Sequence, residues 1–212
     1  MKKTFLLTSI LLCLNTYAQT SFGLKAGYTL SKLKTSSEIN TVDYDAHSGF
    51  HFGALVETKL NKTWALQGEL LYSRLGGTAS YVMQYQFPND FSYLPRFEED
   101  VSYNTLQLPI MGKYYFNDKI VATAGVNFSF ILSGTYKTDA YNSSTTEFLV
   151  SVEDNADNVK GAFITPFLGA EYQMNNHFFI DGRYYFPSNI SKYDEIDSKI
   201  NFLQIGIGYK FK

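Results

Sequence analysis

Hydrophobic and polar residues alternate with a period of two along much of this chain. The last segment, residues 201–211, shows the pattern most clearly. One of its faces is apolar and carries Leu203, Ile205, Ile207, Tyr209 and Phe211. The other face is small or polar and carries Gln204, Gly206, Gly208 and Lys210. A period of two predicts a β-strand with one apolar and one polar face.

Seven earlier segments repeat the pattern, at about 21–33, 48–60, 64–75, 103–116, 120–132, 161–174 and 177–186. The connections between them alternate in length: 34–47, 76–102, 134–160 and 187–199 are long, and 61–63, 117–119 and 175–176 are short. A soluble β-sandwich is the alternative interpretation, but it gives no reason for this regularity. Short turns on one side and long loops on the other are typical of outer-membrane barrels.

The sequence therefore predicts an all-β protein, an eight-stranded antiparallel transmembrane β-barrel with short periplasmic turns and long outer loops. Apolar residues would face lipid, and polar residues would face a narrow lumen. The last strand would pair with the first, so that no strand edge meets hydrocarbon.

Residues 1–18 have the features of a cleaved secretory signal peptide. Lys2 and Lys3 precede a short apolar run, and residues 16–18 form a small-x-small cleavage site. We therefore expect a single barrel domain at 19–212, exported to the outer membrane of a Gram-negative cell. The one cysteine, Cys13, would leave with the signal, which excludes disulfides and thiolate metal sites in the mature chain.

Composition supports this interpretation in two ways. Aromatic residues make up 17% of the chain, mostly Tyr and Phe, which suit membrane interfaces. A net charge of −2 gives no indication of nucleic-acid binding. No sequence feature calls for a cofactor, and the oligomeric state is left open.

Two prolines interrupt predicted strands. Pro109 lies in the middle of its strand, where we expect a bulge or a local break because proline has no N–H to donate. Pro166 lies near the outer end of its strand and is expected above the membrane.

Charged residues on the polar strand faces predict a salt-bridged plug inside the lumen. The predicted network comprises Lys25, Glu57, Glu69, Lys113, Glu171, Asp181 and Arg183, with Lys59 and Lys210 also facing inward. Folding the 175–176 turn would place Glu171 level with Asp181, where Arg183 could serve one or both carboxylates. A lumen of eight strands filled in this way leaves no room for an aqueous channel. A polar ligand or proton path is the alternative.

The outer rim offers a weaker candidate for catalysis. His47, Ser48 and His51 begin the second strand, with Asp43 and Asp45 nearby, and a histidine could activate a hydroxyl there. However, the two histidines stand at different heights on one strand. We predict no catalytic residues, and His177, in a turn, is expected to be a surface residue.

The long outer loops carry more Asp and Glu than Lys and Arg. They are either simply solvated, or they bind divalent cations that bridge to lipopolysaccharide, or they dock an envelope protein. The aromatic residues of the second loop are the best contact candidates, namely Tyr81, Tyr85, Phe87, Phe91 and Tyr93.

Five stretches of sequence carry a family resemblance: Ala18-Gln19, the opening GLKAGY, LQLPIMGKYYF, the NDK turn and the closing LQIGIGYKF. They resemble the small outer-membrane β-barrel proteins of Bacteroidota, the PorT-like outer membrane protein beta-barrel domain group. The resemblance implies a fold and not an activity, and one member type, PorT, is associated with a secretion system of gliding bacteria.

Three functional hypotheses follow. The favoured one is a non-enzymatic barrel that anchors outer loops for interaction with a partner, in contact with outer-membrane lipid. The second is a PorT-like component of a secretion or transport assembly. An outer-membrane lipid-modifying enzyme is a distant third.

Overall fold

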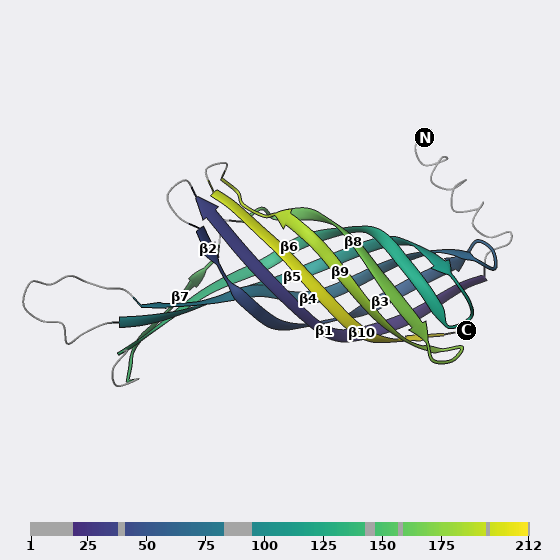
Figure 1. Ribbon diagram of the computed structural model, residues 1–212, viewed down its shortest axis with the longest axis horizontal. Coiled ribbons are helices and arrows are strands. Elements are labelled where there is room, and N and C mark those ends of the chain that lie inside the picture. Colours follow the sequence, from purple (N-terminus) through teal and green to yellow (C-terminus); the bar gives the residue numbers. More distant parts are fainter. Residues whose placement is uncertain are drawn as a thin grey trace, which may run out of the picture.

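The computed structural model describes residues 19–37, 41–82, 95–142, 147–156, 159–193 and 196–211 (Figure 1). The predicted signal peptide lies outside the described residues. No helix in this part of the chain is long and apolar enough to cross a membrane.

The described structure is a single antiparallel sheet. Its strands are β1 (Gln19–Ser37), β2 (Thr41–Asp43), β3 (Asp45–Lys59), β4 (Trp64–Val82), β5 (Pro95–Tyr115), β6 (Ile120–Asn142), β7 (Phe148–Asn155), β8 (Ala162–Gln173), β9 (Phe178–Asn189) and β10 (Ile196–Lys210).

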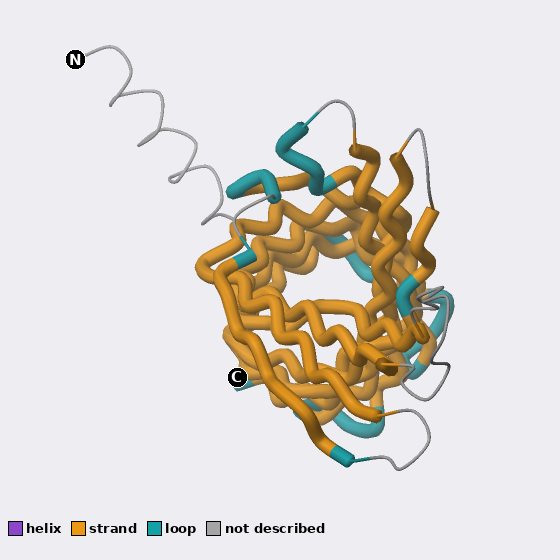
Figure 2. The backbone as a smooth tube through the Cα atoms, turned by 90° about the vertical axis from the view of Figure 1, so that its left-hand side faces the viewer, coloured by secondary structure: helices purple, strands orange, loops and turns teal. Residues whose placement is uncertain are grey.

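Eight long strands close into a ring (Figure 2). Its order is β1, β3, β4, β5, β6, β8, β9, β10, and β10 pairs back on β1 from Gly23–Lys210 to Ser37–Ile196. β2 adds to β1, and β7 adds to β6. Ring closure pairs the first strand with the last, so the sheet has no free edge strand. The predicted eight-stranded antiparallel barrel is confirmed.

Outward-facing side chains form an apolar band around the ring. On β1, Phe22, Leu24 and Tyr28 are exposed, whereas Lys25 and Thr29 are buried in the lumen. Aromatic residues in ring contact mark the two ends of the band. At the end with the short turns these are Trp64, Tyr114, Phe116, Phe178, Tyr209 and Phe211. At the opposite end they are Phe50, Phe52, Tyr72, Tyr184 and Phe186. An apolar belt between two aromatic girdles is what a membrane-spanning barrel requires.

The long outer connections are present, but much of their length is not irregular. β4 stays paired with β5 as far as Val82–Arg96, and β6 continues to Asn142 and pairs with β7. These strands form a sheet that projects beyond the barrel, at the left of Figure 1. The barrel already fixes the register, so each further residue pair adds hydrogen bonds without closing a new loop. Thr, Tyr and Val in these segments also favour strands.

Pro109 produces the local break and no bulge. β4 and β5 pair up to Gly68–Ile110 and resume at Leu71–Gln107 in the same register. Odd-numbered residues of β5 donate toward β4, as Tyr115 N does to Thr63 O. Pro109 has no N–H at one of these positions, so one rung is lost while the strands on both sides hold the register.

The expectation that Pro166 lies above the membrane is wrong. Pro166 pairs with Val126, and Ile164, two residues farther out, is apolar and 58% exposed. Pro166 is therefore in the wall of the outer half of the barrel, within the apolar band.

Candidate functional site

The lumen holds two clusters of paired charges, and the first lies near mid-height. Arg183 donates from Nη1 and Nη2 to the two carboxylate oxygens of Glu69, both at 2.7 Å. Its Nε lies 2.8 Å from Asp181 Oδ2, and Lys25 forms a close ion pair with the same carboxylate. All four side chains are inaccessible to solvent. Two cations and two anions leave this cluster electrically neutral.

The second cluster lies closer to the short turns. Lys113 Nζ lies 2.7 Å from both Glu57 and Glu171. Lys210 Nζ lies 2.8 Å from Glu57 and 3.0 Å from Glu171. Tyr115 donates its hydroxyl proton to Glu57 Oε1 at 2.5 Å. This cluster is also neutral, so neither group of buried charges leaves a net charge in the membrane interior.

One uncharged side chain joins the clusters. Gln67 donates from Nε2 to Glu69 Oε1 at 2.5 Å and accepts from Lys113 Nζ at 2.9 Å. Because an amide can donate and accept at once, it continues the network without adding charge.

All seven side chains of the predicted lumen network are buried. Glu171 does pair directly with Asp181 in the strand register. Arg183 nevertheless contacts Asp181 and Glu69, whereas Glu171 is held by Lys113 and Lys210. Lys59, also expected to face inward, is exposed at the end of β3. The bridging role of Gln67 was missed, because alternation gives the face of a residue but not its partner across the lumen.

The outer half of the lumen contains an apolar cluster that the sequence did not predict, beside buried polar side chains such as His51, Gln107 and Asn127. This cluster, the apolar plug, consists of Leu33, Leu75, Val101, Tyr103, Met111, Phe163, Phe167, Tyr185, Ile190, Ile200 and Phe202. The rings of Tyr185 and Phe202 stack at 4.2 Å between centroids. Runs such as Tyr184-Tyr185-Phe186 are apolar on both faces of the strand. These runs were the sequence feature that could have predicted apolar side chains in the lumen.

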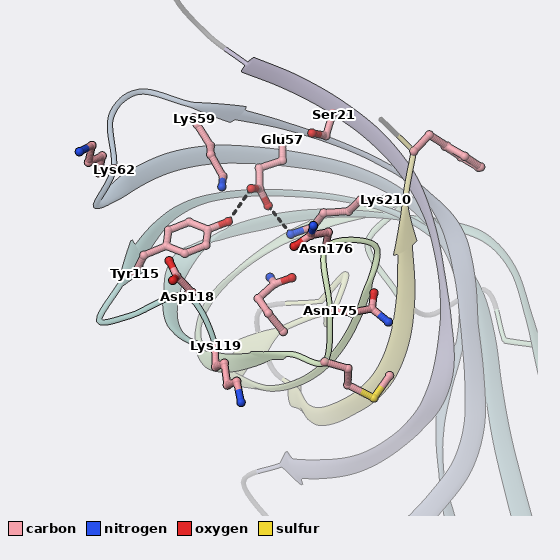
Figure 3. A pocket seen from close by; sticks show the side chains of 13 residues that line it. Ser21, Glu57, Lys59, Lys62, Tyr115, Asp118, Lys119, Asn175, Asn176 and Lys210 are labelled. Carbon is pink, nitrogen blue, oxygen red and sulfur yellow. Dashed lines mark hydrogen bonds and ion pairs between the residues drawn. The ribbon is translucent and has the colours of Figure 1, made fainter.

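A cavity of about 510 Å³ opens at the end of the barrel with the short turns (Figure 3). Glu57, Lys210 and Tyr115 of the second cluster line it, and Lys59, Lys62 and Lys119 are at its rim. The Lys59 ammonium lies 5.1 Å from the centre of the Tyr115 ring. The mouth of the barrel is thus basic and polar, and its inner wall is the charge network.

Three asparagines close the short turns at this end of the barrel in the same way. Asn61, Asn117 and Asn175 each begin a short turn, and each side-chain oxygen accepts from the backbone N–H groups two and three residues later, at 2.8–2.9 Å. This local bonding closes the turn without help from the rest of the fold.

The rim residues considered for catalysis do not come together. Ser48 is exposed and hydrogen-bonds with Tyr28 on the outer surface. His47 and His51 are buried in the lumen, where His47 lies 3.6 Å from Asp100 and His51 lies 3.0 Å from Thr29 Oγ1. Burial lowers the pKa of His47, although Asp100 opposes the shift. His177, in its turn, is partly buried and contacts the Lys210 carbonyl.

Among the predicted loop contacts, Tyr81 lies on β4 in the projecting sheet. Its hydroxyl donates to Glu99 at 2.5 Å, and Tyr44 donates to the same carboxylate at 3.4 Å. Burial, with Glu99 nearby, raises the pKa of Tyr136 to about 12. Tyr85, Phe87, Phe91 and Tyr93 lie outside the described residues. In the described ranges, no group of three or more His, Cys, Asp or Glu could hold a metal ion.

The model of the outer membrane protein beta-barrel domain family matches residues 17–192. The chain belongs to this family. Membership in the outer membrane protein beta-barrel domain family places the protein in a Gram-negative outer membrane, with its short turns facing the periplasm and its projecting sheet outside.

Several solved structures are similar. Neisserial surface protein A is 14% identical, with 91% of this chain and 99% of that chain covered, at a TM-score of 0.49. Ail of Yersinia pestis is 15% identical, with 91% and 99% covered, at a TM-score of 0.46. OprG of Pseudomonas aeruginosa is 13% identical, with 92% and 97% covered, at a TM-score of 0.40. No curated protein matches the chain.

Proposed function

We propose that this barrel is a non-enzymatic membrane anchor that presents its projecting sheet to a partner protein of the cell envelope. The observation that carries the proposal is the continuation of β4, β5, β6 and β7 past the apolar band as a paired sheet. A sheet held by a closed barrel is a rigid platform, and it is placed where a partner outside the membrane can reach it.

The surface of the sheet supports this role. Every residue of β7 is exposed, including Phe148, Leu149, Val150 and Val152. Tyr81 and Val82 add exposed apolar area on β4. Apolar side chains on an aqueous surface are the usual anchors of protein interfaces. The filled lumen supports the same proposal. Because paired charges and the apolar plug occupy the lumen, we expect a partner to bind at the outer surface.

A component of a secretion or transport assembly is the second candidate. It rests on the resemblance of GLKAGY and LQLPIMGKYYF to the PorT-like barrels of Bacteroidota. In both candidates the outer surface has a protein partner, so one experiment can separate them.

The experiment places a photo-crosslinking amino acid at Val152 and, as a matched control, at Leu66, in cells with native membranes. The two side chains are similarly exposed, at 58% and 50%, but Leu66 faces lipid. The anchor proposal expects a protein adduct at Val152 and none at Leu66. An adduct with secretion-machinery subunits favours the second candidate. Lipopolysaccharide adducts alone, or no adduct at Val152, would refute both.

A further inference from the structure

The barrel wall has a seam between β8 and β9 in its outer half. The two strands pair from Gln173–Phe179 up to Phe167–Tyr185, and pairing stops there. Both strands continue outward, β8 to Ala162 and β9 to Asn189. The interruption is therefore in the ladder between strands and not at the end of either one.

Pro166 accounts for the β8 side of the seam. At the turn, Met174 N donates to Phe178 O, so even-numbered residues of β8 donate toward β9. Pro166 is the next such position beyond Leu168, and it has no N–H. Pro166 therefore cannot donate the hydrogen bond that would continue the ladder past Phe167–Tyr185, and no pairing of the two strands follows.

Pro187 disturbs the pairing of β9 with its other neighbour, β10. Lys210 N donates to His177 O, so odd-numbered residues of β9 face β10. Pro187 interrupts that series, and the register with β10 shifts by one residue between Tyr185–Phe202 and Ser188–Ile200. Beyond the shift Ile190 N donates to Ser198 O, so even-numbered residues now face β10 and not β8. The Ser188 hydroxyl crosses the seam and donates to Ile164 O at 2.7 Å.

The seam lies at the height of the outer leaflet. Ile164 and Phe186 border it and are both exposed within the apolar band. Directly behind it is the apolar plug, with Phe163, Phe167 and Tyr185. The Thr165 and Tyr185 hydroxyls are buried there, and neither has a hydrogen-bond partner within the described residues.

We propose that this seam is a lateral opening through which an acyl chain of an outer-leaflet lipid enters the apolar part of the lumen. Acyl chains are the molecules that cover the wall at this height, and the plug offers them buried apolar side chains to pack against. Movement of Phe167 and Tyr185 makes the room. The Thr165 and Tyr185 hydroxyls donate to an ester or hydroxyl oxygen of the same lipid. The site is separate from the projecting sheet and does not depend on the proposed partner.

The test uses a tryptophan reporter in the full mature protein, reconstituted in bilayers of lipids with brominated acyl chains. The chain has a single tryptophan, so Trp64→Phe gives a silent background. Phe167→Trp places the reporter behind the seam. Leu71→Trp is the matched control, because Leu71 is equally buried in the lumen but lies on β4, across the ring.

We expect the brominated lipids to quench the reporter at 167 more strongly than the reporter at 71. Pro166→Val with Pro187→Val restores both missing N–H groups and should lower the quenching at 167 to that at 71. Pro109→Val restores a donor elsewhere in the wall and should leave it unchanged. Equal quenching at 167 and 71, or no effect of the sealing pair, would overturn the proposal. Folding of each variant is checked by heat-modifiability on a gel, and Phe163→Trp replaces Phe167→Trp if the latter does not fold.

Discussion

At the scale of single residues, the lumen charges matter most. Burying an ion costs several kcal/mol, and a partner with good geometry offsets that cost. Each of the two clusters has equal numbers of cations and anions, and Gln67 joins them. Such clusters contribute little net stability, but losing one member leaves its partners buried and unpaired.

Arg183→Ala should therefore destabilise the barrel strongly. It removes both hydrogen bonds to Glu69 and the ion pair with Asp181, leaving Lys25 alone with two carboxylates. We expect a loss of about 3–5 kcal/mol in the free energy of unfolding, measured by denaturant titration in detergent. Arg183→Lys should recover only part of the loss, because an ammonium cannot form the two-pronged contact.

The control for this experiment is Arg74→Ala. Arg74 is also on a barrel strand, but it is partly exposed and contacts Ser102 Oγ at 3.2 Å. Its removal should have a small effect. Equal stabilities of Arg183→Ala and the parent would mean that the lumen charges are solvated, and the plug hypothesis would be abandoned in favour of a polar pathway.

His47 at the outer rim gives a prediction on pH. Burial lowers the pKa of its imidazole below the usual 6.5, so below pH 6.5 the unfolded chain binds the proton more readily than the folded one. The contribution of a neutral His47 to the free energy of unfolding is thus present above pH 6.5. It is lost as the pH falls through the pKa that His47 has in the folded protein. The His47 ring signal in NMR, assigned with His47→Gln, should titrate below 6.5. A midpoint above 6.5 would show that Asp100 outweighs burial.

At the scale of elements, the short turns and the prolines have different consequences. An asparagine-capped turn is closed by its own side chain, so each periplasmic hairpin is specified locally. A proline instead removes a bond between neighbouring strands. The result depends on its position, because Pro109 is held on both sides and keeps its register, whereas Pro166 lies where pairing ends.

Asn175→Ala should weaken the β8–β9 hairpin. It removes the acceptor for His177 N at 2.9 Å and for Phe178 N at 2.8 Å. We expect a loss of about 1 kcal/mol in unfolding free energy for the hydrogen bonds. Asn176→Ala, in the same turn, is the control and should be nearly neutral. Similar losses for the two variants would show that the turn depends on general solvation and not on the Asn175 cap.

At the scale of the whole molecule, the barrel should not conduct. Along its length the lumen contains the basic periplasmic mouth, the two neutral charge clusters and the apolar plug. An eight-stranded barrel is only wide enough for its own side chains. Planar-bilayer recordings of the refolded protein should show no stable open state. Steady, large conductance steps would contradict the filled lumen.

The fold could be predicted from the sequence because its signals are local. Alternation along residues 201–211 gives the lipid face and the lumen face, since successive side chains of a strand point in opposite directions. The short connections at 61–63, 117–119 and 175–176 identify the hairpins, which leaves little freedom in the topology. Burial of the predicted charges inside the lumen follows from the same alternation.

The tertiary structure alone decided which lumen residues meet. Arg183 pairs with Glu69 from the far side of the ring, because partners across a barrel depend on strand stagger, which alternation does not contain. The length of the projecting strands depends on register set inside the barrel. The seam depends on which neighbouring strand a proline faces. Pro109 and Pro166 lie in similar strands, but β4 and β5 resume pairing beyond Pro109, whereas β8 and β9 do not resume pairing beyond Pro166. Only the pairing of the folded strands shows this difference.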